Sequence, residues 1–144
     1  MQMIDKTVIG SLIQSASEML ARSGDGDNHP VAASIYADDS AIYSGMNLYH
    51  FTGGPCAEIV ALARLASDGG GAKALAIVAV ADRDRGVIAP CGRCRQILTD
   101  YYPEIQVILS IEDRIRAVRL TELLPHGYLR VARPEITRNI QDSR

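Results

Sequence analysis

All three cysteines of the chain lie in two short motifs whose residue types suit a metal ion. The motifs are Pro55-Cys56-Ala57-Glu58 and Pro90-Cys91-Gly92-Arg93-Cys94. Three thiolates can bind Zn²⁺ and leave one tetrahedral position open, which is typical of catalytic rather than structural zinc. A carboxylate two residues after the first cysteine can move protons to and from a water molecule at that position. The spacing therefore predicts a site that turns water into a nucleophile.

Two other interpretations of the cysteines remain possible from the residues alone. A closed structural zinc site would need a fourth ligand from His29, His50 or His126, and His50 is the nearest of these in sequence. A redox pair in the C-x-x-C motif would leave Cys56 and Glu58 without a role. The open site accounts for all of these residues and is the interpretation that we favour.

Three thiolates on a dication leave a net negative charge, so positive neighbours are expected around the sulfur atoms. Arg93 lies between two of the ligands, and Arg85 lies six residues before Cys91. Either side chain could donate hydrogen bonds to the sulfurs. Both arginines are therefore candidates for supporting the metal ligands, although each could also be an ordinary solvated side chain.

The bulk composition is that of one globular domain with a small-molecule substrate. The chain has 144 residues, 47% of them hydrophobic and 22% charged, and its net charge is −2. That balance argues against nucleic acid as a partner, because phosphate binding needs clustered Lys and Arg. Neither a secretion signal nor an apolar run of bilayer-spanning length is found, so we expect no membrane association. An odd number of cysteines fits reduced thiols, and the prediction is a cytoplasmic protein.

The elements that must position the two motifs follow from hydrophobic periodicity and from the breakers between them. Apolar residues from Ile4 to Leu20 recur at helical spacing, and the run from Ala74 to Ala81 is typical of a strand buried on both faces. Further helices are expected over about 56–67 and 91–101, further strands over 31–37, 41–46 and 105–111, and a short helical turn over 121–124. Helices that alternate with buried strands predict an α/β domain with helices on both faces of one sheet. The helix over 56–67 is apolar on nearly every side, so we expect it at the centre of the fold.

Both motifs are expected at helix starts, where a proline precedes the first cysteine. Exposed amide groups and the helix dipole favour negative charge there, which should lower the pKa of Cys56 and Cys91. Cys94 comes one turn after Cys91 and shares its helix face. Two helix starts can thus converge on one ion.

The polar run from Ser23 to Asn28 invites interpretation as a calcium loop. With Asp25 in the first position, however, the residue in the twelfth position would be Tyr36 rather than an acid. The sequence therefore predicts a plain solvated turn.

The two cysteine motifs resemble those of the cytidine deaminase superfamily, specifically its members with three cysteine ligands. Within it, the stretch from Asn47 to Glu58 and the stretch from Pro90 to Gln96 look most like the blasticidin-S deaminases. Similarity can be followed from about residue 31 to residue 128. The resemblance implies a three-layer α/β/α fold with a five-stranded mixed sheet over residues 1–130, followed by a C-terminal extension over 131–144. It also implies a homotetramer with sites near subunit interfaces.

The same resemblance implies a zinc-dependent aminohydrolase that releases ammonia from a cytosine-like amino-heterocycle. It assigns Cys56, Cys91 and Cys94 to zinc and the proton transfers to Glu58. The substrate contacts that it implies come from Asn47, Tyr49, Phe51, Ala57 and Tyr128.

Two departures from the family pattern leave the substrate open. Cytidine deaminases read ribose with Asn-x-Glu, whereas this chain has Asn47-Leu48-Tyr49. Blasticidin-S deaminases close the pocket with a C-terminal Tyr and Trp; here Tyr128 matches the Tyr, but Arg130 stands where the Trp is expected. Blasticidin S, cytidine or deoxycytidine, and a free or modified pyrimidine, triazine or purine base all remain candidates. A zinc-stabilised binding protein without turnover is the non-enzymatic alternative, and Glu58 argues against it because such a protein needs no acid beside the metal.

Overall fold

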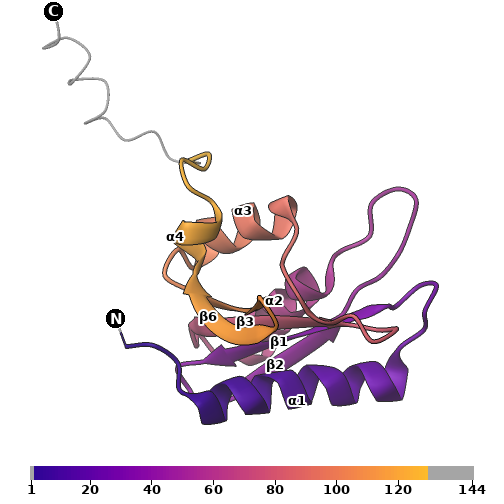
Figure 1. Cartoon of the computed structure of the whole chain (residues 1–144). Helices are drawn as coiled ribbons and strands as arrows, with labels where there is room; N and C mark the ends of the chain where they lie inside the picture. The colour runs from indigo at the N-terminus through magenta and orange to yellow at the C-terminus, as the bar shows by residue number, and fades with distance from the viewer. Residues whose placement is uncertain (1, 130–144) are drawn as a thin grey trace, which may run out of the picture.

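A mixed β-sheet forms the middle layer of the computed structural model, which describes residues 2–129 (Figure 1). Five strands follow one another in the order β2-β1-β3-β5-β6, and the short β4 pairs with the end of β3. Strands β3 and β5 are parallel, whereas the other neighbouring strands are antiparallel. The strands are β1 Val31–Ala37, β2 Ile42–Met46, β3 Ala74–Ala81, β4 Gly86–Ile88, β5 Gln106–Ile111 and β6 Arg114–Arg119.

Helices cover both faces of this sheet and complete three layers (Figure 1). Helix α1, Lys6–Ser23, packs Leu12 and Ala16 on one face, where they meet Val78 and Ile108. A second hydrophobic core lies on the other face, under α2 Ala57–Asp68, α3 Gly92–Tyr101 and α4 Leu120–Leu123. The three-layer α/β/α fold predicted from the sequence is confirmed.

Capping and turn residues mark the ends of several helices and strands. Helix α1 begins after Asp5, whose carboxylate accepts a hydrogen bond from the Val8 backbone N–H, and it ends at Gly24. The β1–β2 hairpin turns at Ser40, which adopts a positive φ of 67°. Strand β3 is buried on both faces, as its unbroken apolar run predicts.

Two strands and one packing relation differ from the expectation. Strands β4 and β6 were not predicted: β4 has only three residues, and β6 lies at the sheet edge with Arg114, Arg116 and Arg119 among its six residues. Edge strands often carry charge because charge hinders pairing with other chains, and that charge hides the strand pattern. Helix α2 buries one face only, since Ala63 and Ala66 are exposed.

The predicted C-terminal extension, 131–144, lies outside the described residues, as does Arg130. In the part of the chain that the structure describes, no helix combines the length and the apolar content needed to cross a lipid bilayer.

Candidate active site

The three cysteines meet at the N-termini of two helices, as the sequence predicts. Cys56 is the N-cap of α2 and Cys91 is the N-cap of α3, both in extended backbone conformation. Cys94 lies in the first turn of α3 and is fully buried. Because α2 and α3 rest on the same face of the sheet, their first turns bring together sulfur atoms that are 35 residues or more apart in sequence.

The arrangement of the sulfur atoms fits a zinc ion. The Sγ atoms of Cys56 and Cys91 are 3.8 Å apart, and all three Sγ atoms lie within 4.8 Å of one another. Two sulfurs bound to one zinc at about 2.3 Å with tetrahedral angles are separated by about 3.8 Å. Among the described residues, which include all three histidines, only the cysteines form such a group. The chemistry and spacing of the donors therefore match a three-thiolate zinc site with a free fourth position.

The three thiols do not ionise equally. Burial disfavours the charged form of Cys91, but the backbone N–H groups of Cys94 and Arg93 at the helix start, together with the neighbouring thiols, bring its pKa below the ordinary value. Burial raises the pKa of Cys56, and the nearby Cys91 adds to the rise. Burial and the charge of Glu58 raise the pKa of Cys94. The expected lowering of the pKa at a helix N-terminus holds for Cys91 but not for Cys56, because burial of the Cys56 thiol and, to a smaller extent, the neighbouring Cys91 oppose it.

Glu58 points into the same site from the first turn of α2. Its side chain is 5% exposed, and burial raises the pKa of its carboxyl above the usual range. Hydrogen bonds from its own backbone N–H and from the Cys94 thiol act in the opposite direction. A carboxyl group that is buried beside the sulfurs can hold a proton or release it at a fixed position.

A cavity of about 360 Å³ opens above the cysteines and Glu58. Cys56, Ala57, Glu58 and Cys91 form one part of its wall. The loop after β2 forms another part through Asn47, Leu48, Tyr49, His50, Gly53, Gly54 and Pro55, and Val31, Ile88 and Ala89 complete the lining. Glu58 is the one carboxylate in this lining. The volume falls within the range of small-molecule sites, which is roughly 300–1,000 Å³.

The loop from residue 48 to residue 55 is ordered by its own hydrogen bonds. The Leu48 N–H donates to the Pro55 carbonyl at 3.0 Å, and the Gly53 N–H donates to the His50 carbonyl at 3.0 Å. Gly54 has no room for a side chain, because a Cβ atom there would overlap the Leu48 carbonyl oxygen. The closed base of the loop therefore fixes the wall of the cavity beside Cys56.

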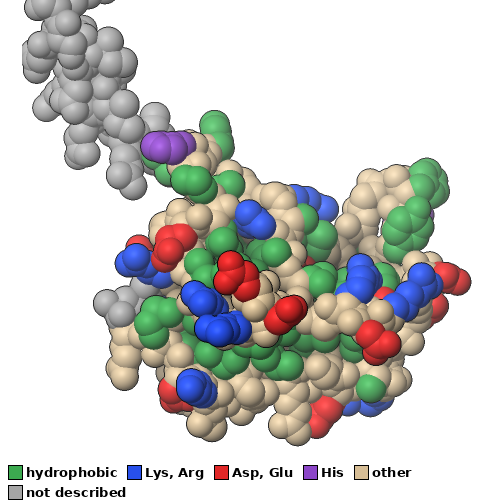
Figure 2. Space-filling view, viewed as in Figure 1, with side chains coloured by type: hydrophobic (Ala, Val, Ile, Leu, Met, Phe, Trp, Pro, Cys, Tyr) green, Lys and Arg blue, Asp and Glu red, His purple; other side chains and the backbone are tan. Residues whose placement is uncertain are grey.

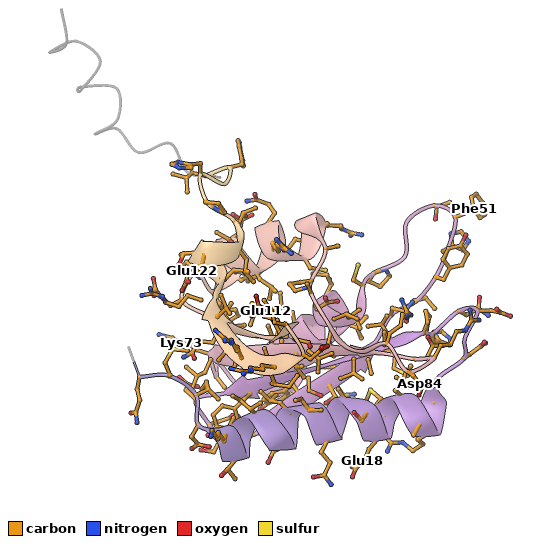
Figure 3. The ribbon with its side chains drawn as sticks, in the orientation of Figure 1. Glu18, Phe51, Lys73, Asp84, Glu112 and Glu122 are labelled. Atoms are coloured by element: carbon orange, nitrogen blue, oxygen red, sulfur yellow. The ribbon has the colours of Figure 1, made fainter. Side chains whose placement is uncertain are left out.

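The structure defines the tautomer of His50 and the exposure of Phe51 in this loop. The Thr52 backbone N–H donates to His50 Nδ1 at 3.1 Å, so Nδ1 is an acceptor and the neutral ring carries its hydrogen on Nε2. Phe51 is 86% exposed and lies at the tip of the loop, which rises away from the sheet (Figure 3). Figure 2 shows hydrophobic side chains at this projecting end.

The structure brings some of the predicted substrate contacts to the cavity and not others. Asn47, Tyr49 and Ala57 line it, whereas Phe51 and Tyr128 do not. Tyr128 is 73% exposed, and its backbone carbonyl accepts a hydrogen bond from Gln96 Nε2 at 3.0 Å. Contact of these residues with a substrate stays a prediction.

Among the described residues, neither of the predicted supporting arginines donates a side-chain hydrogen bond to a sulfur atom. The Arg85 guanidinium donates to the Asp82 carboxylate at 3.0 Å, and the Arg93 side chain is exposed while its backbone N–H faces Cys91. Sequence reasoning missed Arg95, which donates to the carbonyls of Pro90 and Leu123 at 2.9 and 3.0 Å. Arg95 thereby ties the segment before Cys91 to α4. The only sequence feature that could have indicated a role for Arg95 is its position directly after Cys94 in the same helix turn.

Comparison with known proteins gives the same family from sequence and from structure. Residues 7–109 match the family model of the cytidine and deoxycytidylate deaminase zinc-binding region. The chain is 30% identical over 129 residues to blasticidin-S deaminase of Bacillus cereus, covering 83% of this chain and 91% of that protein. It is 40% identical over 106 residues to cytidine deaminase of Sporosarcina psychrophila, covering 69% and 74%. The crystal structure of cytidine deaminase from Mycobacterium tuberculosis superposes with a TM-score of 0.69 at 28% identity, covering 84% of this chain and 97% of that one.

Proposed function

The chain belongs to the cytidine and deoxycytidylate deaminase family of zinc-dependent hydrolases that act on C–N bonds, and we propose that its substrate is a cytosine-like amino-heterocycle. The observation that carries the proposal is the group of three cysteine sulfurs beside a buried carboxyl at the base of a cavity. The net reaction replaces the exocyclic amine with an oxygen from water and releases ammonia.

Cys56, Cys91 and Cys94 would hold the zinc ion through their thiolates. A zinc ion held there would lower the pKa of the water molecule that it binds to near neutrality. Hydrogen bonds from the neighbouring thiols and from the N–H groups at the start of α3 lower the pKa of Cys91 and so favour the thiolate form of this ligand.

Glu58 is the group to which we assign both proton transfers. Its carboxylate takes a proton from the attacking water and gives it to the ring nitrogen beside the amino-bearing carbon. It then transfers the second proton of that water to the departing amine, which leaves as ammonia. Burial of Glu58 keeps bulk water away from the carboxyl while it carries the proton.

The mouth of the cavity separates the possible substrates. Among the described residues, Glu58 is the only carboxylate that lines the cavity. No second carboxylate of this lining is therefore available to accept hydrogen bonds from the hydroxyl groups of a sugar. Tyr49 and His50 present hydrogen-bond donors instead. Blasticidin S, another modified nucleoside or a free base therefore fits the site better than ordinary cytidine, because acceptance or rejection of a hydroxyl depends on buried polar partners.

We also propose that the protein acts as a homotetramer with its sites near subunit interfaces. The exposed side chains of Tyr49 and Phe51 beside the cavity support this, as do the exposed Ala63 and Ala66 on the outer face of α2. Apolar surface next to a cavity is typical of an interface. On the face drawn in Figure 2, basic and acidic side chains are mixed rather than gathered into a basic stripe, which favours a small-molecule substrate over nucleic acid.

The direct test is a substrate screen with ammonia detection on the zinc-loaded protein. The compounds are blasticidin S, cytidine, deoxycytidine, cytosine, and amino-substituted triazines and purines. We expect ammonia from blasticidin S or a free base at a higher kcat/KM than from cytidine. Release from cytidine alone would contradict the substrate assignment, and no ammonia from any compound by a protein with one zinc per chain would contradict the proposed reaction.

A further inference from the structure

Asn47, at the edge of the cavity, is held by hydrogen bonds through every one of its polar groups. Its backbone N–H donates to the Val31 carbonyl at 3.1 Å, and its Oδ1 accepts from the Val31 N–H at 3.0 Å. Its Nδ2 donates to the Asn28 carbonyl at 3.1 Å, and its own carbonyl lies 2.7 Å from His29 Nδ1. All four partners belong to the segment 28–31. This segment, and not the substrate, sets the orientation of Asn47.

The bond from His29 has a fixed direction. The Asn47 carbonyl can only accept, so His29 Nδ1 must carry the hydrogen and donate it. The other three hydrogen bonds on Asn47 use backbone groups or the side chain of Asn47 itself. His29 therefore supplies the one restraint that a single side-chain substitution outside Asn47 can remove.

We propose that His29 is a positioning residue for substrate binding, acting through Asn47 on the loop that walls the cavity. The inference rests on the proposed function, because Asn47 and Tyr49 matter only if a substrate occupies that cavity. His29 does not line this cavity. It lines a second one of about 360 Å³, on the side of Met46 and Val60, so its influence on a substrate must pass through Asn47.

The turn that carries His29 is built to hold it in place. The backbones of Asp25 and His29 pair through hydrogen bonds of 2.7 and 3.2 Å. The Asp25 carboxylate accepts from the Asp27 N–H at 3.0 Å and from Asn28 Nδ2 at 3.2 Å, and these bonds lower its pKa. The Asp25 carboxylate therefore stays charged to a lower pH than that of an ordinary aspartate. The polar run that the sequence presents as a plain solvated turn is the platform for Asn47.

The same turn reaches the next residues of the loop. The Asn28 carbonyl, which accepts from Asn47 Nδ2, also accepts from the Tyr49 backbone N–H at 3.1 Å. Loss of the His29 bond therefore removes one of five hydrogen bonds that tie Asn47 and Tyr49 to segment 28–31, and it loosens a segment whose side chains, Asn47 to Tyr49, line the cavity. The metal ligands are attached to α2 and α3 and share no hydrogen bond with this turn among the described residues. Substrate affinity should change while the chemical step does not.

The test compares His29→Phe, His29→Asn and Asp27→Ala. Phenylalanine keeps a ring but has no donor, whereas asparagine places an amide N–H where Nδ1 stands. Asp27 belongs to the same turn but, in the described structure, contributes only its backbone N–H to these hydrogen bonds. We expect His29→Phe to raise KM about three- to tenfold, the range for one lost hydrogen bond, with kcat within about twofold. His29→Asn and Asp27→Ala should keep KM within about twofold of the wild-type value.

Hydrogen exchange of residues 47–52, read by mass spectrometry without substrate, provides a measurement that does not depend on turnover. We expect faster exchange in His29→Phe and wild-type protection in His29→Asn. An unchanged KM and unchanged exchange in His29→Phe would overturn the proposal. Equal losses of kcat and zinc in His29→Phe and His29→Asn would overturn it too, because they indicate a purely structural role. Wild-type protein that deaminates no compound would refute the proposed function, and the exchange result would still decide the role of His29.

Discussion

Replacing Glu58 with glutamine removes the proton carrier and little else. The amide has nearly the same shape as the carboxyl and can still accept a hydrogen bond from the backbone N–H of residue 58. Burial already disfavours the charged form of this side chain, which is 5% exposed, so a neutral amide there should change the free energy of unfolding by less than about 1 kcal/mol. All three thiolates remain, and zinc should stay at one ion per chain.

The loss should fall on kcat. An amide neither takes nor gives a proton, and positioned acid–base catalysis contributes about 10²- to 10⁴-fold, which corresponds to about 3–5 kcal/mol of barrier. Because Glu58 is assigned two transfers in one turnover, we expect the upper end of that range. The assay is ammonia release at saturating substrate, with zinc measured by mass spectrometry on the same samples.

The matched control is Glu18→Gln, since Glu18 lies on the outer side of α1 and accepts a hydrogen bond from Gln14 (Figure 3). It should keep wild-type kcat. A Glu58→Gln protein whose kcat stays within about tenfold of wild type would refute the assignment of proton transfer to Glu58. Loss of zinc from that variant would instead show that the carboxyl supports the metal.

Three further outcomes follow from the structure. Cys91→Ser should lower the zinc content below one per chain after dialysis against a chelator, and activity should fall in proportion. Gly45→Ala should lower the free energy of unfolding by about 1–3 kcal/mol in denaturant melts, because the new Cβ would lie 2.6 Å from Val60 Cγ1 and 2.7 Å from a backbone nitrogen of α2. Hydrogen bonds from the Tyr43 hydroxyl and from the backbone lower the pKa of Asp39, so its stabilising effect is present at neutral pH and is lost as pH falls through that lowered pKa. Tyr43→Phe should therefore raise the pKa of Asp39 by NMR titration, and its destabilisation should shrink in acid; a difference independent of pH would contradict this.

The sequence predicts the metal site well because its information is local. A proline before Cys56 and before Cys91 marks two helix starts, and the i, i+3 spacing places Cys94 on the same face as Cys91. These short-range rules do not depend on the rest of the fold. The buried strand β3 is equally recognisable, since a continuous apolar run needs cover on both faces.

The parts that the sequence did not predict depend on contacts between distant segments. Strand β6 carries three arginines and is held by pairing with β5, so its own pattern is not that of a strand. Arg95 acts on α4 through a carbonyl 28 residues further along the chain. Composition and periodicity do not predict hydrogen bonds between residues that are far apart in sequence, so these bonds become visible only in the folded structure.

Within the site, the residues for the reaction lie in local sequence motifs, whereas the residues for substrate specificity are positioned by contacts between distant segments. Sulfur and carboxyl groups come from the first turns of α2 and α3, which the core holds rigidly on the sheet. The wall that would meet the rest of the substrate comes from a loop after β2, whose start is fixed by the turn at Asp25–His29. A change in that turn or loop can alter which heterocycle binds without moving the sulfurs. For this reason the cysteine motifs identify the reaction, while the substrate must be read from Asn47, Tyr49 and His50 and from the hydrogen bonds that hold them.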